Sequence, residues 1–372
     1  MLRTTRSSQS LLARWWWTID RYSLMAIFAL MALGAVLVTA SSPPVAERIG
    51  LDPFYFVRHQ QIFLLLALPV LIGVSLMSPL WVRRLSVFGL GASFFLMILV
   101  PFFGFETKGA SRWINVMGFS IQPSEFMKPF FAVITAWIFS LRQKYIDFPA
   151  YWLSFGMYGF AVLLLLLQPD FGMVVTLTVI WSVQVFLAGL PMIWVLLLVL
   201  MAAGGGVGAY FLFHHVRQRI DRFLDPTTGD NYQVERSLEA FQNGGFLGRG
   251  PGEGQVKLSL PDSHTDFIFA VVGEEFGLIA CLLIVGLFFF IVAMGLIRVW
   301  RESDSFLMIA VAGLLTQFSI QALINMGVSV QLLPAKGMTL PFLSYGGSSV
   351  MAVAMAMGMV LALTRKRFGK SL

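Results

Sequence analysis

The sequence predicts an all-α fold, a polytopic integral membrane helical bundle of about ten transmembrane helices with a long outer loop between helices 7 and 8. Of its 372 residues, 58% are apolar and only 12% are charged, against roughly a quarter charged in soluble domains. Charge-poor runs recur along the chain, and a helix needs about 20 apolar residues to cross a bilayer. These observations exclude a soluble enzyme.

The charge-poor runs give the expected spans. They are 22–40, 60–78, 85–103, 124–141, 151–168, 171–189, 192–213, 267–297, 306–326 and 342–363. The first run could also be a cleaved signal peptide ending near Ala40, but it is longer than the roughly 7–15 residues of such a segment. The single cysteine, Cys281, lies in an apolar run, so neither an intrachain disulfide nor a cysteine zinc site is expected.

Basic residues set the expected orientation. With the N-terminus inside, the inner segments hold 14 basic residues against four acidic ones, which agrees with the positive-inside rule. We therefore expect a cytoplasmic segment at 1–21, one transmembrane domain over 22–363 with the outer loop at 214–266, and a cytoplasmic tail at 364–372. The basic inner segments account for the net charge of +7. We therefore expect the protein to contact membrane lipids and no nucleic acid.

Three outer segments are rich in polar residues: 104–123, 214–266 and 327–341. In the longest, Val234, Leu238 and Phe241 recur at helical spacing before glycines stop the pattern, which predicts a short amphipathic helix. A glycine-rich run over 244–254 follows. It lacks the βαβ context of a nucleotide-binding motif, so a backbone-rich loop is expected.

Ionisable groups beside the predicted spans are candidate functional residues, because charges in a membrane are costly unless they are paired or hydrated. Glu125 and Lys128 are three residues apart at the start of the fourth span and can form an ion pair. That pair either neutralises two embedded charges or lines a hydrated cavity. Asp170 separates two apolar runs and is either a turn residue, a helix cap or part of a site.

Asp266 enters the eighth span from a polar loop, next to Phe267 and Phe269. Partial burial there would raise the pKa of its carboxyl group and make it a better base. The alternative is that Asp266 only caps the helix. His264 competes for the role of base. Further along, prolines and glycines interrupt residues 332–349, where Lys336 either faces a phosphate or extends to the membrane surface.

Five motifs occur in an order that resembles the SEDS family, the bacterial shape, elongation, division and sporulation proteins. They are 109–114 (GASRWI), 122–125 (QPSE), 168–170 (QPD), 264–267 (HTDF) and 341–347 (PFLSYGG). Ser111 and the pair Asp262-Ser263 depart from the usual pattern. The segments 325–327 and 333–342, with Lys336, are more similar to the division branch than to the elongation branch.

This resemblance implies a ten-helix glycosyltransferase that polymerises lipid II in the bacterial inner membrane, at the division septum. It also implies a cognate class B penicillin-binding transpeptidase and other division proteins as partners. The family's catalytic aspartate falls on Asp266 and its outer-loop tryptophan on Trp113. Normal polymerisation by an Asp266→Asn protein would eliminate that assignment.

The remaining candidates would contact substrate on the outer face. Cationic partners for the leaving diphosphate are expected among Arg112, Lys128, Arg249 and Lys336; the other candidates are Glu125, Asp170, His264, Thr265 and Ser344. No cofactor is identified and the four histidines lack metal-ligand spacing, although a divalent cation could also serve the diphosphate.

Two other functions are compatible with a polytopic protein that has an outer polar site. A lipid II flippase would have similar helices and charges, but it would relocate lipid II without lengthening glycan. A non-catalytic division scaffold would tolerate the loss of the Asp266 carboxylate.

Overall fold

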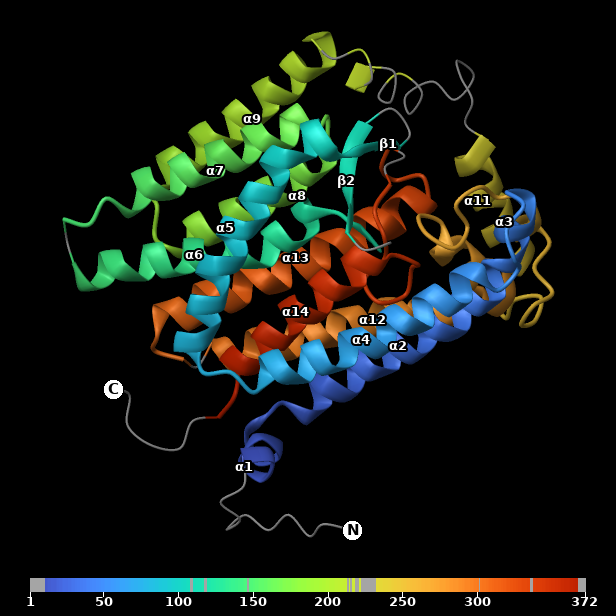
Figure 1. Cartoon of the computed structure of the whole chain (residues 1–372), viewed down its shortest axis with the longest axis horizontal. Coiled ribbons are helices and arrows are strands. Elements are labelled where there is room, and N and C mark those ends of the chain that lie inside the picture. The colour runs from blue at the N-terminus through green and yellow to red at the C-terminus, as the bar shows by residue number, and fades with distance from the viewer. Residues whose placement is uncertain are drawn as a thin grey trace.

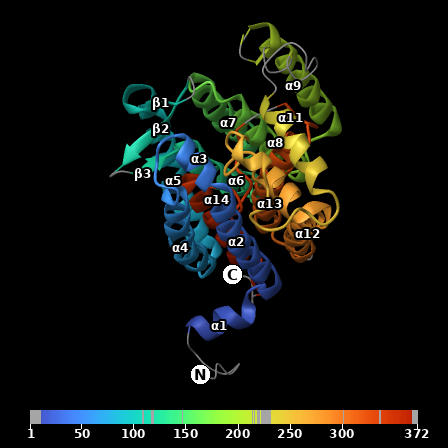
Figure 2. The same ribbon diagram turned by 90° about the vertical axis from the view of Figure 1, so that its right-hand side faces the viewer.

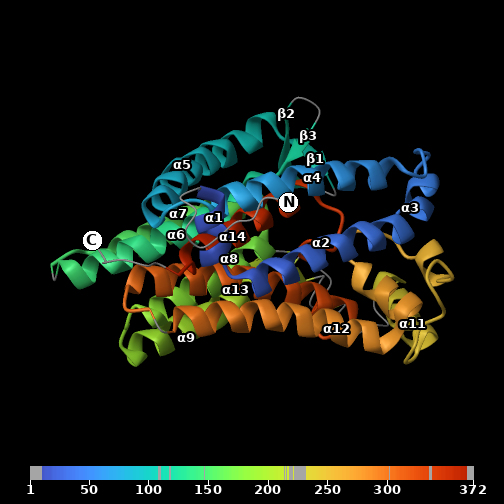
Figure 3. The ribbon, with the colours of Figure 1, turned by 90° about the horizontal axis from the view of Figure 1, so that it is seen from below.

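The structure is a computed structural model that describes residues 11–107, 110–116, 119–145, 147–212, 214, 216–217, 221, 232–300, 302–334 and 337–366. Long helices run in roughly one direction through the molecule (Figure 1 and Figure 3). The helices are α1 (Leu11–Thr18), α2 (Arg21–Ser41), α3 (Pro43–Arg48), α4 (Tyr55–Ser75), α5 (Pro79–Phe103), α6 (Pro123–Lys144), α7 (Ala150–Leu167), α8 (Phe171–Leu187), α9 (Met192–Leu212), α11 (Tyr232–Gly244), η1 (Val256–Leu258), α12 (Ile268–Val299), α13 (Ser305–Ser329) and α14 (Gly347–Leu363).

Each predicted span overlaps one long helix, which confirms the helical membrane class. Among the described residues, six helices are long and apolar enough to cross a membrane: α2, α4, α5, α7, α12 and α13. Helices α8 and α14 are apolar but have 17 residues each, and α6 carries charged residues at both ends. The number of ten transmembrane helices stays a prediction.

Three predicted helix starts were wrong: those of α4, α5 and α14. Helix α5 begins at Pro79 rather than residue 85, because the helix continues through Arg83 and Arg84. Helix α4 begins at Tyr55 rather than residue 60, because a helix continues through polar residues that a hydropathy pattern excludes. Helix α14 begins at Gly347 rather than residue 342. The apolar side chains of Phe342 and Leu343 are buried, but their backbone is not helical, and Phe342 has a φ of +65°.

Helices α6, α13 and α14 form the interior of the bundle, and most of their residues are buried. The surrounding helices bury one side only. On α12, for example, Leu283, Phe289 and Ile297 are exposed, as expected of a face that meets lipid. Helix α9 lies at the periphery (Figure 1 and Figure 2).

The first and the last helices that the structure describes meet on one side of the bundle, here called the terminal face. Arg298 at the end of α12 forms an ion pair with Asp20, with Nε 2.8 Å from Oδ2. Asp20 also caps α2. Thr18 of α1 accepts hydrogen bonds from the side chain of Arg365 and the backbone of Lys366, just beyond α14. The starts of α2 and the ends of α12 and α14 therefore share one face.

The opposite side, here called the loop face, carries α3, α11 and a small sheet (Figure 1 and Figure 3). The sheet has the order β1 (Phe105–Thr107), β2 (Ala110–Val116), β3 (Phe119–Ile121) and is antiparallel throughout. The sequence did not predict these strands. Helix α11 over Tyr232–Gly244 confirms the amphipathic helix predicted in the long loop.

The glycine-rich run is packed against a break in α12. At Gly277 the backbone leaves the helical region, with φ +74° and ψ −174°. The amides of Arg249 and Gly250 donate to the carbonyls of Glu274 and Glu275, at 2.9 and 3.0 Å. A Cβ on Gly277 would lie 2.4 Å from the Gly248 nitrogen. Glycine is needed here for both the positive φ and the close approach.

Candidate functional site

Asp266 lies in a turn that leads into α12 on the loop face. Its side chain is partly buried, and Phe267 and Phe269 beside it are almost fully buried, as the sequence predicted. The N-cap residue of α12 is Phe267, and no side chain caps that position. Asp266 is therefore not the cap of this helix.

The turn itself is organised by Asp262. This residue has a φ of +54°, a left-handed conformation that aspartate tolerates better than most residues. Its carbonyl accepts hydrogen bonds from the amides of Thr265 and Asp266, at 3.0 and 3.1 Å. The backbone amide of Asp266 is thus held from within the turn.

Three consecutive carbonyls of this turn are held by other segments. Each accepts one hydrogen bond from outside the turn: His264 from the Tyr345 amide at 2.8 Å, Thr265 from the Ser344 hydroxyl at 2.5 Å, and Asp266 from Nδ2 of Asn325 at 2.8 Å. The donors come from α13 and from the non-helical segment before α14. The backbone that carries the Asp266 carboxylate is therefore held by two segments distant in sequence.

Gly337 lies directly beside the Asp266 carboxylate. A Cβ on Gly337 would be 3.1 Å from Oδ2 of Asp266, so the backbone of this segment forms one wall of the site. Asn325 also donates to the carbonyl of the next residue, Met338, at 2.6 Å. The predicted phosphate contact Lys336 precedes Gly337 in the chain but lies outside the described residues.

Glu125 and Lys128 form the ion pair that their spacing predicted. Oε2 of Glu125 is 2.8 Å from Nζ of Lys128, and both side chains are buried. Lys128 Nζ also donates to Oε1 of Gln321 at 3.3 Å. Nε2 of Gln321 donates to the carbonyl of Thr339 and to the hydroxyl of Ser349, both at 3.1 Å. The pair is thus connected through α13 to the segment that borders Asp266.

Arg112 fixes the sheet to the turn between α7 and α8. It donates from Nε to the Gln168 carbonyl at 3.1 Å and from Nη2 to the Pro169 carbonyl at 2.5 Å, and its Nε is 3.8 Å from Oδ2 of Asp170. Asp170 is the N-cap residue of α8 and accepts from the Met173 amide at 3.2 Å. The cap expected as one alternative for Asp170 is therefore present.

The other predicted site residues lie around this framework. Trp113 is half-buried on β2, paired with Phe105 of β1. Arg249 is exposed, and its Nε is 3.4 Å from the Asn243 carbonyl. Thr265 donates to the Asp262 carbonyl at 3.2 Å. The hydroxyl of Ser344 donates to the Thr265 carbonyl and also accepts from the Leu340 amide at 2.8 Å.

His264 is buried in an aromatic cluster. Its ring centroid is 4.4 Å from that of Phe56 and 5.5 Å from that of Tyr345. The extended start of α4 supplies Phe56, which explains why this part of the helix matters to the site. The cluster packs against the turn through the His264 ring.

Two acidic residues on α12 hold the long loop that precedes this helix. Glu274 accepts from the amides of Gln255 and Val256, both at 2.9 Å. Glu275 pairs with Nζ of Lys257 and accepts from the Gly252 amide at 3.0 Å. Because both carboxylates are buried and satisfied within the protein, their arrangement is that of a loop anchor.

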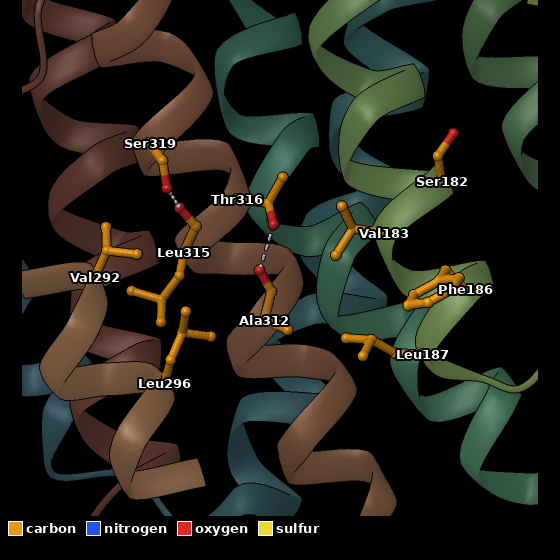
Figure 4. Close-up of a pocket in the computed structure, with 10 residues that line it drawn as sticks. All are labelled: Ser182, Val183, Phe186, Leu187, Val292, Leu296, Ala312, Leu315, Thr316 and Ser319. Atoms are coloured by element: carbon orange, nitrogen blue, oxygen red, sulfur yellow. Dashed lines mark hydrogen bonds between the residues drawn. The ribbon is translucent and has the colours of Figure 1, made fainter. Parts of the chain in front are cut away.

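A groove lies between α8, α12 and α13, in the half of the bundle nearer the terminal face (Figure 4). Its volume is about 530 Å³. It is lined by Ser182, Val183, Phe186, Leu187, Val292, Leu296, Ala312, Leu315, Thr316 and Ser319. The Thr316 and Ser319 hydroxyls donate to backbone carbonyls of α13, so the surface offered is mainly hydrocarbon. Among the described residues, no group of three or more His, Cys, Asp or Glu side chains could hold a metal ion.

Comparison with known proteins agrees with these features. The profile of the cell cycle protein family FtsW/RodA/SpoVE matches residues 21–368. The chain belongs to this family, which is the SEDS family indicated by the motifs. A relative from Caulobacter vibrioides, named "Probable peptidoglycan glycosyltransferase FtsW", is 44% identical over 365 residues, covering 98% of this chain and 94% of the relative.

Other SEDS relatives give the same result. The protein with the same name from Escherichia coli O6:H1 is 35% identical, over 92% of this chain and 85% of its own length. A chain from a structure titled for the coordination of polymerization and crosslinking by a peptidoglycan synthase complex superposes with a TM-score of 0.78, at 26% identity, covering 93% of this chain and 97% of that chain. The RodA crystal structure from Thermus thermophilus shares the fold, with a TM-score of 0.68 and 24% identity over 94% of this chain and 97% of its own.

The sequence did not indicate that Asn325, Gln321 or Gly337 would border Asp266. Asn325 was noted only within a motif of the division branch. The available signal was that Gln321 and Asn325 are polar residues one helical turn apart in an apolar span, where uncharged polar side chains hydrogen-bond across helices.

Proposed function

We propose that this chain is a peptidoglycan glycosyltransferase of the division type, which polymerises lipid II into glycan strands and releases undecaprenyl diphosphate. The observation that carries the proposal is the half-buried Asp266 carboxylate, on a backbone fixed by three external hydrogen bonds at the loop face of a membrane bundle. The names of the relatives from Caulobacter vibrioides and Escherichia coli support the same activity.

The shape of lipid II explains why an enzyme would consist mostly of membrane helices. Its polyprenyl tail belongs in hydrocarbon, whereas its diphosphate and disaccharide-peptide head belong in water. Exposed apolar side chains on helices such as α12 provide a hydrocarbon surface for the polyprenyl tail. The polar segments of the loop face near Asp266 provide a hydrated surface for the diphosphate and the head.

The chemical step is an inverting transfer in which Asp266 acts as general base. The carboxylate accepts the proton of the acceptor sugar's 4-hydroxyl as that oxygen attacks the anomeric carbon of the donor. The bond from that carbon to the diphosphate breaks, the electron pair leaves with the diphosphate, and a β-1,4 linkage forms. General base catalysis contributes about 10²–10⁴-fold to the rate of such steps.

Negative charge grows on the leaving diphosphate and requires nearby positive charge. Arg112, Arg249 and Lys336 are the candidates, together with Lys128, which is buried in its pair with Glu125. A divalent cation bound with the diphosphate could supply the same stabilisation. Lipid II turnover is measured in EDTA and again after Mg²⁺ is restored. The comparison shows whether the diphosphate is stabilised by side chains alone or by side chains together with a bound cation.

The direction of the protein in the membrane follows from its charges. Basic residues such as Arg298 and Arg365 lie at the terminal face, so the positive-inside rule places this face in the cytoplasm. Both termini are then cytoplasmic and Asp266 faces the outer side of the bacterial inner membrane, where the division-type assignment puts it at the septum.

A transpeptidase is the partner that this product requires, because new glycan strands must be crosslinked. The solved relative belongs to a complex whose title joins polymerization with crosslinking, which supports a class B penicillin-binding protein as the partner. Other division proteins would bring the pair to the septum.

The test uses the purified full-length protein in liposomes with lipid II, alone and with its transpeptidase. Asp266→Asn should fold normally and lose nearly all glycan synthesis. Asp52→Asn is the matched control, since Asp52 is an exposed carboxylate near the start of α4, in an ion pair with Arg58. Normal glycan synthesis by Asp266→Asn would refute the assignment.

The same assay separates the two alternatives. A flippase moves lipid II between leaflets without lengthening glycan, so wild-type protein would show transport and no polymer. A scaffold would show neither activity, and the Asp266→Asn protein would support division in cells.

A further inference from the structure

Asn325 on α13 bridges the two backbone segments that border the Asp266 carboxylate. Its Nδ2 donates to the Asp266 carbonyl at 2.8 Å and to the Met338 carbonyl at 2.6 Å. Met338 follows Gly337, where a Cβ would lie 3.1 Å from Oδ2 of the carboxylate. One amide nitrogen therefore fixes the spacing between the base and the wall of its site.

The orientation of this amide is determined by its neighbours. An amide nitrogen has two hydrogens to donate, whereas the amide oxygen only accepts. If the group were reversed, Oδ1 would face two carbonyl oxygens and both contacts would be repulsive. Asparagine supplies two donors to two carbonyls from a single uncharged atom, which neither a hydroxyl nor a carboxylate can do.

The position is buried, and its other amide atom has no hydrogen-bond partner within the part of the chain that the structure describes. Asn325 is 1% exposed, and among the described residues Oδ1 makes no hydrogen bond. Leaving a buried acceptor without a partner opposes folding. An apolar side chain would avoid this cost, so packing alone does not explain an asparagine here. The two hydrogen bonds that Nδ2 of Asn325 donates explain why an asparagine occupies this position.

We propose that Asn325 is the positioning residue for Asp266, an inference that rests on the proposed glycosyltransferase function. Asn325 does not touch the substrate. It holds the Asp266 carbonyl from one side, and through Met338 it holds the Gly337 segment from the other. The carboxylate is thereby presented to the acceptor hydroxyl at a fixed angle and distance. Loss of the bridge leaves the base present but displaced.

The same helix provides a matched control. Gln317 lies eight residues before Asn325, about 12 Å along the helix. It is also 1% exposed, and neither of its amide atoms has a hydrogen-bond partner among the described residues. Gln317→Leu therefore removes a buried amide from α13 without altering any contact of Asp266.

The experiment measures lipid II polymerisation by full-length protein carrying Asn325→Ala, Asn325→Asp, Asn325→Gln or Gln317→Leu. Asn325→Asp keeps the side-chain volume but replaces both donors, so its effect cannot be assigned to a cavity. We expect Asn325→Ala and Asn325→Asp to lower kcat by about 10–100-fold, as misplacement of a catalytic group does, while KM stays within about twofold. Asn325→Gln, with its amide one methylene further out, should recover only part of kcat. Gln317→Leu should match wild type.

A double variant tests whether Asn325 acts through Asp266. Residues that work as one unit are not additive, so Asp266→Asn with Asn325→Ala should be no less active than Asp266→Asn alone. A further additive loss would overturn the proposal, as would wild-type kcat in folded Asn325→Ala and Asn325→Asp. Failure of all three Asn325 variants to fold would also overturn it, by making the residue a packing element. If Asp266→Asn itself polymerises lipid II, the proposed function fails instead.

Discussion

Gly337 lies against the Asp266 carboxylate so closely that a Cβ at this position would be 3.1 Å from Oδ2. Such a contact is tighter than an ordinary van der Waals contact, so a side chain at Gly337 has to displace the carboxylate or its own backbone. The three hydrogen bonds to the His264–Asp266 carbonyls oppose movement of the backbone. The carboxylate is the part that can rotate.

Gly337→Ala should therefore lower kcat with little effect on folding. We expect a loss of about 10–100-fold, the range produced by displacing a catalytic group by up to 1 Å. Gly73→Ala is the control, because a Cβ on this helical glycine of α4 meets nothing within 4 Å. Wild-type polymerisation by Gly337→Ala, measured with purified lipid II, would show that the carboxylate tolerates the contact.

Breaking the buried Glu125–Lys128 pair should destabilise the protein strongly. Glu125→Gln or Lys128→Met alone leaves the partner charge buried and unpaired, which costs about 3–5 kcal/mol. The double variant should recover much of that loss, because no isolated charge is left. Thermal unfolding in detergent measures the change.

The exposed pair between Arg58 and Asp52, with Nη2 3.6 Å from Oδ1, is the comparison. Asp52→Asn removes it and should change stability by less than about 1 kcal/mol. If breaking the exposed pair lowered stability as much as breaking the buried pair, burial would not explain the effect. If the protein carrying both Glu125→Gln and Lys128→Met were less stable than both single variants, an unpaired buried charge would not explain their loss of stability.

The parts of this molecule that follow from local sequence were predictable. Long charge-poor runs predicted the helices, because a spanning helix satisfies its own backbone and needs only length and apolarity. Spacing of three residues predicted the Glu125–Lys128 pair, because such residues share one helix face. The polar segment before α12 was sufficient to place Asp266 where a loop enters this helix.

The remaining parts depend on partners distant in sequence. The contact between Asn325 and Asp266 joins residues 59 positions apart, and no local pattern contains it. Strands β1–β3 are stabilised by pairing with each other and by the bond of Arg112 to the Gln168 carbonyl. The start of α14 was misplaced because Phe342 and Leu343 are buried without being helical.

Arg112 provides a third prediction, since its guanidinium donates to the carbonyls of Gln168 and Pro169. Arg112→Gln should destabilise the protein by about 1–3 kcal/mol, because two acceptors lose charged donors. Arg249→Gln, at an exposed position of the same face, should change stability by no more than about 0.5 kcal/mol. Thermal unfolding and lipid II turnover are measured together. If Arg112→Gln unfolds like wild type but loses turnover, the arginine serves the diphosphate and not the fold.

The break in α12 provides the last prediction. Gly277 has a φ of +74°, and a Cβ there would lie 2.4 Å from the Gly248 nitrogen and 2.5 Å from the Phe246 carbonyl oxygen. Gly277→Ala combines an unfavourable conformation, costing about 1–3 kcal/mol, with a backbone collision that forces the glycine-rich run away from α12. The Glu275–Lys257 anchor would be strained at the same time.

The expected results are a lower unfolding temperature and faster proteolysis within 244–254. Gly286→Ala in the same helix meets nothing within 4 Å and should leave stability unchanged or raise it by up to about 1 kcal/mol. Because the loop anchored at this break leads directly into the Asp266 turn, Gly277→Ala should also reduce polymerisation. Unaltered proteolysis and full activity would mean that the break is not what holds the loop.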